Sequence, residues 1–268
     1  MDAVLLAAGI GSRLRPYTHN IPKCLMPIRK RPLLDYWLAH LIASDVSKIF
    51  INTFHLRDKV NSYVNSLPDE IRELVTLVDE PYLMGTAGSL KRIIKKYGLT
   101  DDIFVAHADN WCDIDLPAFI KSSIFTPSDN LISIMCFHTI NASSSGILSP
   151  HPFKGDLIIG YDEKPECSVL RPLLANGAVY FFPKSTVMDI EILAKGSDSD
   201  IGRDWLPTLV GKISYCSTRN FFRDVGTIDQ LKAAQNDFPE NEPRILTSNE
   251  WLRDKYFDWL RDSNLYDL

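Results

Sequence analysis

The sequence predicts an α/β fold, with a mixed and mostly parallel sheet flanked by helices. In the first half, short apolar runs typical of buried strands alternate with longer segments whose apolar residues recur at helical spacing. Parallel strands need a crossover of about a dozen residues, and helices of that length separate these runs. In the second half, strand-like runs follow one another with fewer helices, so we expect part of the sheet to run antiparallel.

The first strand is expected over residues 3–8, an apolar run that ends at the tight turn Gly9-Ile10-Gly11. Helices and strands then alternate, because apolar residues spaced three or four apart give way to short runs of apolar and β-branched residues. The expected helices cover residues 33–43, 57–65 and 89–97, and the expected strands cover residues 48–54, 74–78 and 103–108.

The second half ends in a boundary marked by two prolines, Pro239 and Pro243. They divide the chain into a main domain, 1–238, and a helical extension, 239–268. Residues 248–264 carry aromatic and leucine side chains at roughly helical spacing, as in an amphipathic helix. This helix either packs on the core or joins two copies in a homodimer, and the sequence leaves both open. Before the boundary, strands are expected at 131–137, 156–161, 178–182 and 213–217, and helices at 185–194 and 227–236.

Composition excludes several functional classes. Of 268 residues, 45% are hydrophobic and 24% are charged, as in ordinary folded chains. The formal charge of −5 provides no global basic field, so nucleic acid is not an expected partner. The five cysteines form no C-x-x-C pair, which argues against a zinc cluster or a disulfide framework and favours a cytoplasmic protein. Because no basic signal region and no apolar stretch of about 20 residues occurs, secretion and membrane insertion are not expected.

Basic residues concentrate around the first turn. Residues 1–34 contain six basic side chains and one acidic one, although the chain as a whole is acidic. Gly9 and Gly11 lack a Cβ, so the backbone of this turn can approach a ligand and present N–H groups to phosphate oxygens. Arg13 and Lys23 would then neutralise a polyphosphate. The alternative is a glycine turn that serves packing alone.

The ordered string from Leu5 to Leu14, followed by Pro22-Lys23-Cys24-Leu25, resembles the signature of sugar-1-phosphate nucleotidyltransferases. The resemblance implies a Rossmann-like nucleotidyltransferase fold. It also implies a reaction in which a nucleoside triphosphate and a sugar 1-phosphate give a nucleotide sugar and pyrophosphate, with Mg²⁺ as cofactor. Arg13 and Lys23 would be catalytic groups that contact the triphosphate. The nucleotide-binding residues implied in this turn are Leu6, Ala8, Gly9 and Gly11.

A second string, Glu80 to Leu90, joins the third expected strand to the helix expected from Ser89. Its small residues would permit close contact with a flat base, and the helix N-terminus would supply spare N–H donors. Taken alone, an ordinary glycine-containing helix start is the favoured interpretation. Beside the first signature, the string is similar to the base-recognition loop of the family in its guanylyltransferase form. The nucleotide-binding residues implied here are Gly85, Thr86, Ala87 and Gly88.

Two aspartates are candidate ligands for a metal ion. Asp109 follows an apolar strand at the carboxyl edge of the sheet, where ligands of open α/β sheets bind, although a lone aspartate there is more often a cap. The resemblance pairs it with Asp224 as the second Mg²⁺ ligand. Ala108 departs from the glycine that usually precedes the first aspartate. His107 is expected to be structural, and Asp113 and Asp115 to be helix-capping or loop residues.

The sugar side of the site is expected in two short segments of the second half. A Glu-Lys pair such as Glu163-Lys164 is usually a solvated charge pair worth little. In the resemblance, however, equivalent residues contact the sugar and its phosphate. This implies that Glu163 accepts hydrogen bonds from sugar hydroxyls and that Lys164 binds the 1-phosphate. Asn176 and Gly177 would line the same pocket.

Together these strings predict an enzyme that transfers GMP from GTP to mannose 1-phosphate or a related hexose or heptose. A thymidylyl- or uridylyltransferase of the same family is one alternative, and a non-catalytic regulator that binds nucleotide sugars is another. A regulator would be expected to have lost charge at Lys23, Asp109 or Asp224, and all three charges are present. An oxidoreductase is disfavoured because Leu14 replaces the third glycine of the dinucleotide fingerprint.

Overall fold

The computed structural model describes residues 1–29, 31–125, 129–166, 171–190, 198–218 and 221–237. The extension expected over 239–268 therefore lies outside the described residues, as does the end of the helix expected at 185–194. Within the described part of the chain, no helix is both long enough and apolar enough to span a membrane.

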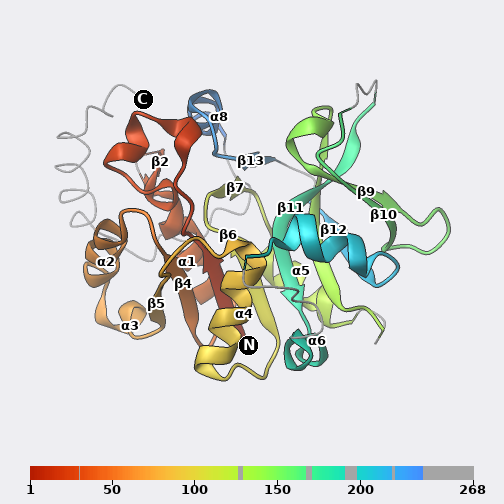
Figure 1. Ribbon diagram of the computed structural model, residues 1–268, viewed down its shortest axis with the longest axis horizontal. Helices are drawn as coiled ribbons and strands as arrows, with labels where there is room; N and C mark the ends of the chain where they lie inside the picture. The colour runs from red at the N-terminus through yellow and green to blue at the C-terminus, as the bar shows by residue number, and fades with distance from the viewer. Residues whose placement is uncertain (30, 126–128, 167–170, 191–197, 219–220, 238–268) are drawn as a thin grey trace.

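The first half of the chain forms the parallel part of a nine-stranded sheet (Figure 1). Its four strands run parallel to one another and end at the same edge. The expected alternation of strands and helices is confirmed. The strands lie in the order β5 (Val75–Asp79), β4 (Ile49–Thr53), β1 (Asp2–Leu6) and β6 (Ile103–His107), and the helices are α1 (Leu33–Ile42), α2 (Arg57–Asn65), α3 (Asp69–Arg72) and α4 (Gly85–Tyr97).

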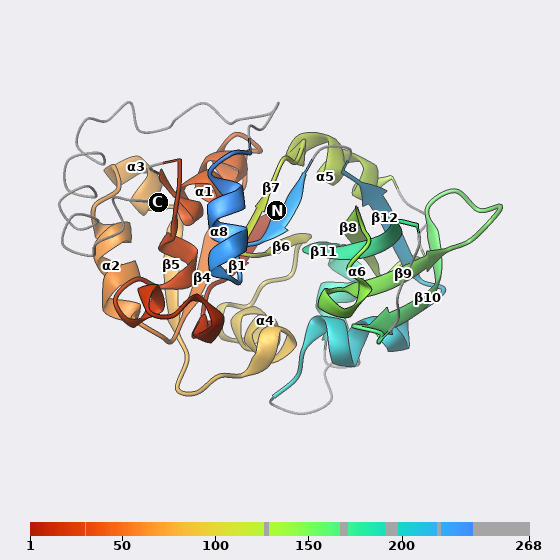
Figure 2. The same cartoon turned by 90° about the horizontal axis from the view of Figure 1, so that it is seen from above.

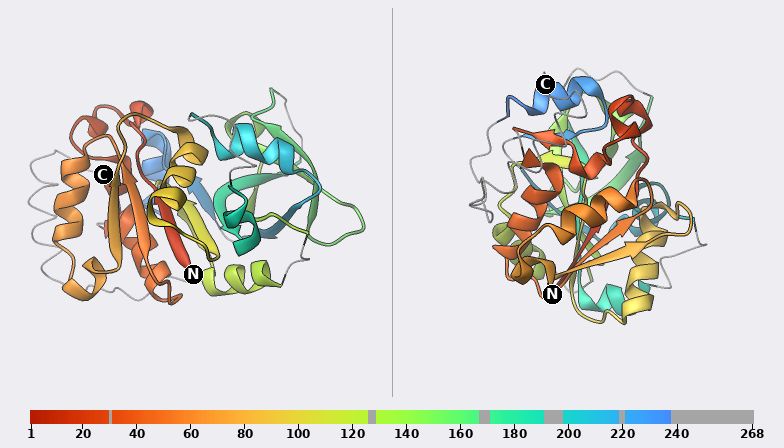
Figure 3. Two further views of the ribbon diagram at one scale, coloured as in Figure 1. Left: turned by 60° about the horizontal axis from the view of Figure 1, so that its bottom comes forward. Right: turned by 90° about the vertical axis from the view of Figure 1, so that its left-hand side faces the viewer.

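The second half continues the sheet with strands of both directions, so the mixed sheet is also confirmed. β11 (Leu173–Phe182) pairs antiparallel with β6. β9 (Gly146–Pro150) pairs with β11 as well as with its other neighbour, so five strands close on themselves. Figure 3 shows this part, in green and cyan, beside the red to yellow first half. The order beyond β11 is β8 (Ile132–Thr139), β12 (Ile213–Ser217), β10 (Leu157–Glu163) and β9.

Two small ribbons and several short helices complete the described chain. Each ribbon is a pair of antiparallel strands. Asp115, expected to be a capping or loop residue, is the N-cap of a helix absent from the sequence-based expectation, and accepts a hydrogen bond from Ala118 N at 3.0 Å. The ribbons are β2 (Pro27–Ile28) with β3 (Arg31–Pro32) and β7 (Asn110–Cys112) with β13 (Phe222–Asp224); the remaining α-helices are α5 (Leu116–Ile124), α6 (Lys184–Met188) and α8 (Ile228–Ala234). Single turns are η1 (Ser12–Leu14), η2 (Tyr17–His19), η3 (Lys23–Leu25), η4 (Ala142–Ser144), η5 (Ile201–Trp205) and η6 (Leu206–Leu209).

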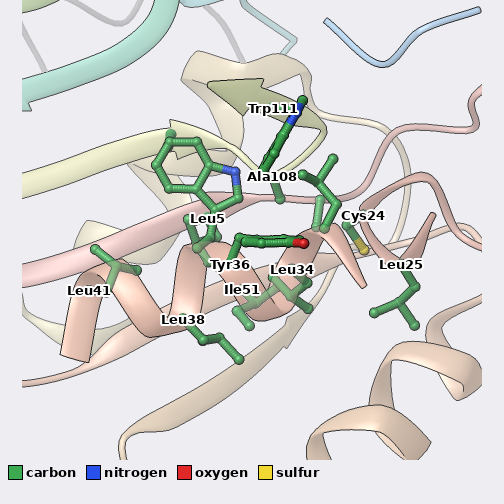
Figure 4. Close-up of a cluster of buried hydrophobic side chains, with 14 of the residues drawn as sticks. Leu5, Cys24, Leu25, Leu34, Tyr36, Leu38, Leu41, Ile51, Ala108 and Trp111 are labelled. Atoms are coloured by element: carbon green, nitrogen blue, oxygen red, sulfur yellow. The ribbon is translucent and has the colours of Figure 1, made fainter. Parts of the chain in front are cut away.

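Helices cover both faces of the sheet, which is why its central strands are apolar throughout. Alternate residues of β1 enter two separate clusters: Ala3 and Leu5 pack on the α1 side, whereas Val4 and Leu6 pack on the α4 side. Figure 2 shows the two helices on opposite sides of the sheet, and Figure 4 shows Leu5 within the first cluster. This packing holds the strand ends, and therefore the loops that follow them, in place.

We expect Phe104→Ala to lower the free energy of unfolding by about 3–5 kcal/mol, because it leaves a cavity in the core. Phe104 is fully buried in β6 between the rings of Trp37 and Phe119. Phe153→Ala is the matched control, since that ring is 91% exposed; its effect should stay within about 0.5 kcal/mol. Urea unfolding of both variants measures the difference, and equal losses would contradict the described packing.

Candidate active site

The candidate site lies where the parallel strands end. β1 leads into the glycine turn, β5 into Glu80, and β6 into Asp109. The carboxyl edge is the usual ligand-binding edge of an open α/β sheet. Ala108 N donates to Leu6 O at 3.0 Å, which keeps the segments after β1 and β6 side by side.

The glycine turn is open on one side and packed on the other. No heavy atom lies within 4 Å of the position that a Cβ on Gly9 would take, so the backbone is accessible there. Gly11 has φ +66°, and its Cβ would lie 2.8 Å from Thr18 Cγ2. Beneath the turn, Leu6 and Ala8 are buried. The turn therefore combines an accessible backbone with a fixed conformation, as binding of phosphate oxygens requires.

Lys23 lies between the two aspartates predicted to hold the metal. Its ammonium group donates hydrogen bonds to Asp109 Oδ2 and, at 2.8 Å, to Asp224 Oδ1. Arg13 Nη2 lies 3.6 Å from the other oxygen of Asp224. The structure thus brings together the four charged residues that the sequence predicted for the phosphate and metal site.

The electrostatics keep this cluster ionised. Burial opposes the charge on Lys23, but Asp109 and Asp224 outweigh it and raise the pKa of Lys23. Burial likewise opposes the charge on Asp109, but Lys23 and then His107 lower the pKa of Asp109 below its ordinary value. At neutral pH Lys23 is therefore an ammonium and Asp109 a carboxylate.

Asp224 reaches Asp109 through the ribbon of β7 and β13. In that ribbon Asp224 lies opposite Asn110, and Val225 N donates to Asp109 O at 3.2 Å. The pairing brings together two carboxylates that lie far apart in the sequence.

α8 anchors this ribbon to the start of the chain, close to β2 (Figure 1). Gln235, at the C-terminal end of α8, donates to Pro27 O and accepts a hydrogen bond from Arg29 N, both at 2.8 Å. Arg223 of β13 forms an ion pair with Asp237. Sequence reasoning did not identify these anchors, because neither a single glutamine nor a single charged pair indicates a partner so far along the chain.

The residues present fit a hard divalent cation. Carboxylate oxygens from Asp109 and Asp224 converge on one point, and Mg²⁺ prefers one or two carboxylates together with phosphate oxygens and water. Among the described residues, no group of three or more His, Cys, Asp or Glu side chains could enclose a metal ion. A metal bound here would therefore need further ligands from phosphates or water.

The expectation for the second string was wrong in one respect. Gly85 to Gly88 form the first turn of α4 instead of a loop before it. The N–H groups of Ala87 and Gly88 both donate to Ser199 O, at 2.9 and 3.1 Å, so they are not spare donors for a base. The reason is tertiary: a segment from the second half of the chain packs on the helix start and satisfies it.

Thr86 joins this helix start to Asp200. The Thr86 hydroxyl donates to Asp200 Oδ2 at 2.7 Å and accepts a hydrogen bond from Ile201 N at 2.8 Å. Asp200 was not among the predicted site residues. An aspartate before an apolar helical turn is an N-cap signal, and Asp200 caps η5 by accepting from Arg203 N, but the link to Thr86 has no local signal.

Glu80 and Asn52 form a buried, hydrogen-bonded pair next to the start of the glycine turn. Asn52 accepts a hydrogen bond from Ala7 N at 2.6 Å and donates to Glu80 Oε1 at 2.8 Å. Ser89 of α4 also donates to this carboxylate. Asn52 was missed, although a polar residue inside an apolar strand is a signal of a specific partner.

Two of the predicted sugar-side residues, Glu163 and Lys164, lie at the end of β10 in the second half. Tyr161 OH donates to Glu163 Oε2, and Lys164 Nζ lies 3.5 Å from Glu163 Oε1. Burial, and then the hydrogen bond to Glu163, raise the pKa of Tyr161, so the phenol stays protonated. The Lys164 side chain is 60% exposed and has φ +48°, an uncommon conformation for a residue with a side chain.

Asn176 and Gly177 lie at an irregularity of β11, where the register with β8 shifts. Asn176 donates to Tyr180 OH at 3.0 Å and accepts from Ala178 N at 2.8 Å. Asn110 Nδ2 donates to Gly177 O at 2.9 Å. Because Asn110 directly follows Asp109, this bond joins the sugar-side segment to the charged cluster.

Gly202 lies between Asp200 and the predicted sugar-side residue Glu163. A Cβ built on it would lie 3.1 Å from Tyr161 OH, 3.2 Å from Glu163 Oε2 and 3.3 Å from Asp200 Oδ1. Asp200 therefore lies near both Thr86 and the Glu163 carboxylate. Together with the hydrogen bond from Asn110 to Gly177, the proximity of Asp200 to Glu163 brings the predicted nucleotide, metal and sugar residues near one another.

Comparison with known proteins identifies a family and several relatives of this chain. The family of nucleotidyl transferases matches residues 2–241. A protein of Sulfolobus acidocaldarius, named provisionally as a mannose-1-phosphate guanyltransferase, is 32% identical over 84% of this chain and 60% of its own length. The UTP–glucose-1-phosphate uridylyltransferase of Synechocystis is 28% identical over 78% of this chain and 55% of its own length. The chain thus spans little more than half of these two relatives.

A third relative matches over nearly its full length. The D-glycero-α-D-manno-heptose 1-phosphate guanylyltransferase of Campylobacter jejuni is 23% identical over 84% of this chain and 95% of its own. Among solved structures, HddC from Yersinia pseudotuberculosis, complexed with GMP-PN, has a TM-score of 0.70 and 23% identity, covering 87% of this chain and 97% of its own. This likeness shows that the fold is shared.

We expect Gly85→Ala to destabilise the protein more than Gly98→Ala. Both glycines have positive φ, at +71° and +63°, so both substitutions carry a conformational cost of about 1 kcal/mol. Only the Gly85 Cβ meets a neighbour, lying 2.3 Å from Ser199 O, whereas nothing lies within 4 Å at Gly98. Urea unfolding should show an additional loss of about 1–3 kcal/mol for Gly85→Ala. Equal losses would show that the segment at Ser199 does not pack on α4.

Proposed function

The chain belongs to the nucleotidyl transferase family, and from this premise we propose that it transfers a nucleoside monophosphate from a nucleoside triphosphate to a sugar 1-phosphate. The observation that carries the proposal is the convergence of Lys23, Arg13, Asp109 and Asp224 at the carboxyl edge of the sheet. Two cations suit the triphosphate, and two carboxylates suit a divalent ion beside it.

The reaction needs little proton chemistry from the protein. The oxygen of the sugar phosphate is already anionic at neutral pH, so no general base is required. This oxygen attacks the α-phosphorus in line, a new P–O bond forms, and the bond to the β-phosphate oxygen breaks to release pyrophosphate. Catalysis then consists of positioning two polyanions and stabilising the charge on the leaving group.

Each proposed residue has a part in that positioning. Arg13 and Lys23 bind the triphosphate over the open backbone at Gly9, and Lys164 binds the sugar phosphate. Mg²⁺ held by Asp109 and Asp224 would supply charge neutralisation between the phosphates.

The other proposed residues shape the substrate pockets. Glu163 accepts hydrogen bonds from sugar hydroxyls, while Asn176 and Gly177 shape the space beside it. Because the N–H groups of Ala87 and Gly88 are engaged by Ser199 O, the first turn of α4 would contact the nucleotide as a close-packed surface without donating these bonds.

We infer that the transferred group is GMP and that the acceptor is mannose 1-phosphate or a related hexose or heptose. The Glu80 to Gly88 string supports this choice, and so do two relatives named as guanylyltransferases of mannose and manno-heptose 1-phosphates. The uridylyltransferase among the relatives keeps a pyrimidine nucleotide as the alternative.

Pyrophosphate release tests the proposal. We expect turnover with GTP to exceed turnover with dTTP, UTP, CTP and ATP when each is paired with mannose, glucose or manno-heptose 1-phosphate. A base that leaves buried polar groups unpaired costs about 1–3 kcal/mol per group, which corresponds to a preference of roughly 5- to 150-fold. Preference for a pyrimidine would overturn the guanylyl assignment alone. Absence of turnover with every pair would favour the regulator.

We expect Asp109→Asn and Asp224→Asn each to lower turnover by at least about 100-fold, because each removes charge stabilisation from the transferring phosphate. Asp162→Asn is the matched control: Asp162 is an exposed aspartate on β10, one residue before Glu163. Its turnover should remain close to that of the original protein. Near-ultraviolet circular dichroism of all three variants verifies folding. Full activity in a folded Asp109→Asn or Asp224→Asn variant would refute the metal assignment.

A further inference from the structure

We propose that Lys23 is an internal counter-ion that occupies the space between Asp109 and Asp224 until the phosphates of a nucleotide draw it away, so that divalent metal and nucleotide enter the site together. This inference rests on the proposed function, since it takes the two aspartates as metal ligands. It concerns the state that precedes catalysis and assigns Lys23 a second role there.

The geometry places one cation where another would have to sit. The Lys23 ammonium contacts one oxygen from each carboxylate. A divalent ion bridging the same two oxygens would approach each to about 2.1 Å, which is closer than an ammonium approaches. Both cations cannot occupy this point, so a metal that binds these two oxygens requires the Lys23 side chain to leave them.

The position of Lys23 is built into the fold. Its side chain is 10% exposed, and it belongs to the 3₁₀ turn η3, whose neighbours Cys24 and Leu25 are buried in the core. Arg13 differs, because its side chain is 69% exposed and it reaches Asp224 only at 3.6 Å. Lys23 is therefore the interposed charge, whereas Arg13 lies at the rim.

The balance of charge in the cluster explains why a divalent ion would need nucleotide in order to bind. Two carboxylates face two cationic side chains, so the cluster has no net charge to attract a free divalent ion. A triphosphate offers Lys23 and Arg13 better partners than the carboxylates, since it concentrates several negative charges in one group and its oxygens accept charge-assisted hydrogen bonds. Once the lysine moves to the phosphates, the carboxylates are left unpaired and need another cation. Metal and nucleotide then stabilise one another's binding.

Mn²⁺ binding, measured by electron paramagnetic resonance, tests this inference without turnover. The proteins are the unmodified chain, Lys23→Met and Arg13→Met, each with and without a non-hydrolysable GTP analogue. Without nucleotide, we expect Lys23→Met to bind Mn²⁺ at least about tenfold more tightly than the unmodified chain, because two converging carboxylates that have lost the ammonium between them repel one another until a metal binds. Arg13→Met removes the same charge from the rim and should stay within about threefold.

The outcomes separate this inference from the proposed function. Equal Mn²⁺ affinity in Lys23→Met and the unmodified chain overturns the counter-ion role, while pyrophosphate release still decides the function. An equal gain in both variants also overturns it, because the effect would then be general charge. Absence of Mn²⁺ binding in every protein, even with nucleotide, overturns the metal assignment on which the inference rests. Lys23→Gln replaces Lys23→Met should the latter not fold.

Discussion

The contact of Lys23 with Asp109 and Asp224 is the interaction on which the arrangement of the site depends. It joins three segments that are distant in sequence: the stretch after the glycine turn, the end of β6, and β13. Burying such charges is costly unless each meets an opposite charge in good geometry. The β7–β13 ribbon and the anchoring of α8 by Gln235 are therefore part of the site, because they keep Asp224 in place.

The second half of the chain supplies a different chemistry. Its site residues are held mostly by hydrogen bonds between tyrosine, asparagine and carboxylate groups, as at Tyr161, Glu163 and Asn176. Two residues with side chains, Lys164 and Ala178, have positive φ. Such conformations are costly and persist only where the surroundings impose them, and they cluster at functional sites. Both residues lie beside the predicted sugar-side residues Glu163 and Asn176, whereas Arg29, Asp45 and Leu56 adopt the same conformation outside the predicted site.

Sequence reasoning succeeded where the determining interactions are local or follow from the sheet. The apolar strands were predictable because both faces of the sheet are covered, and the position of Asp109 because it follows a strand that ends at the carboxyl edge. Asp224 lies in the separate β7–β13 ribbon, and only the resemblance paired it with Asp109. The start of α4 at Gly85 was not predictable, because the N–H groups of its first turn donate to Ser199 O from the other half of the chain. The pairing of β9 with β11 could not be predicted for the same reason, because strand pairing over such distances in the sequence leaves no local pattern.

The distribution of charge along the chain explains how an acidic protein can hold an anionic ligand. A chain with a formal charge of −5 is an unexpected host for two polyanions, because its overall field repels them. Yet basic residues outnumber acidic ones six to one over residues 1–34, and the open backbone at Gly9 lies within that stretch. Screening confines surface charges to about 10 Å, so a ligand at the glycine turn experiences Arg13 and Lys23, together with the two aspartates that they contact, more than the distant acids of the chain. Net charge thus bears on solubility, whereas the local field at the carboxyl edge decides what binds there.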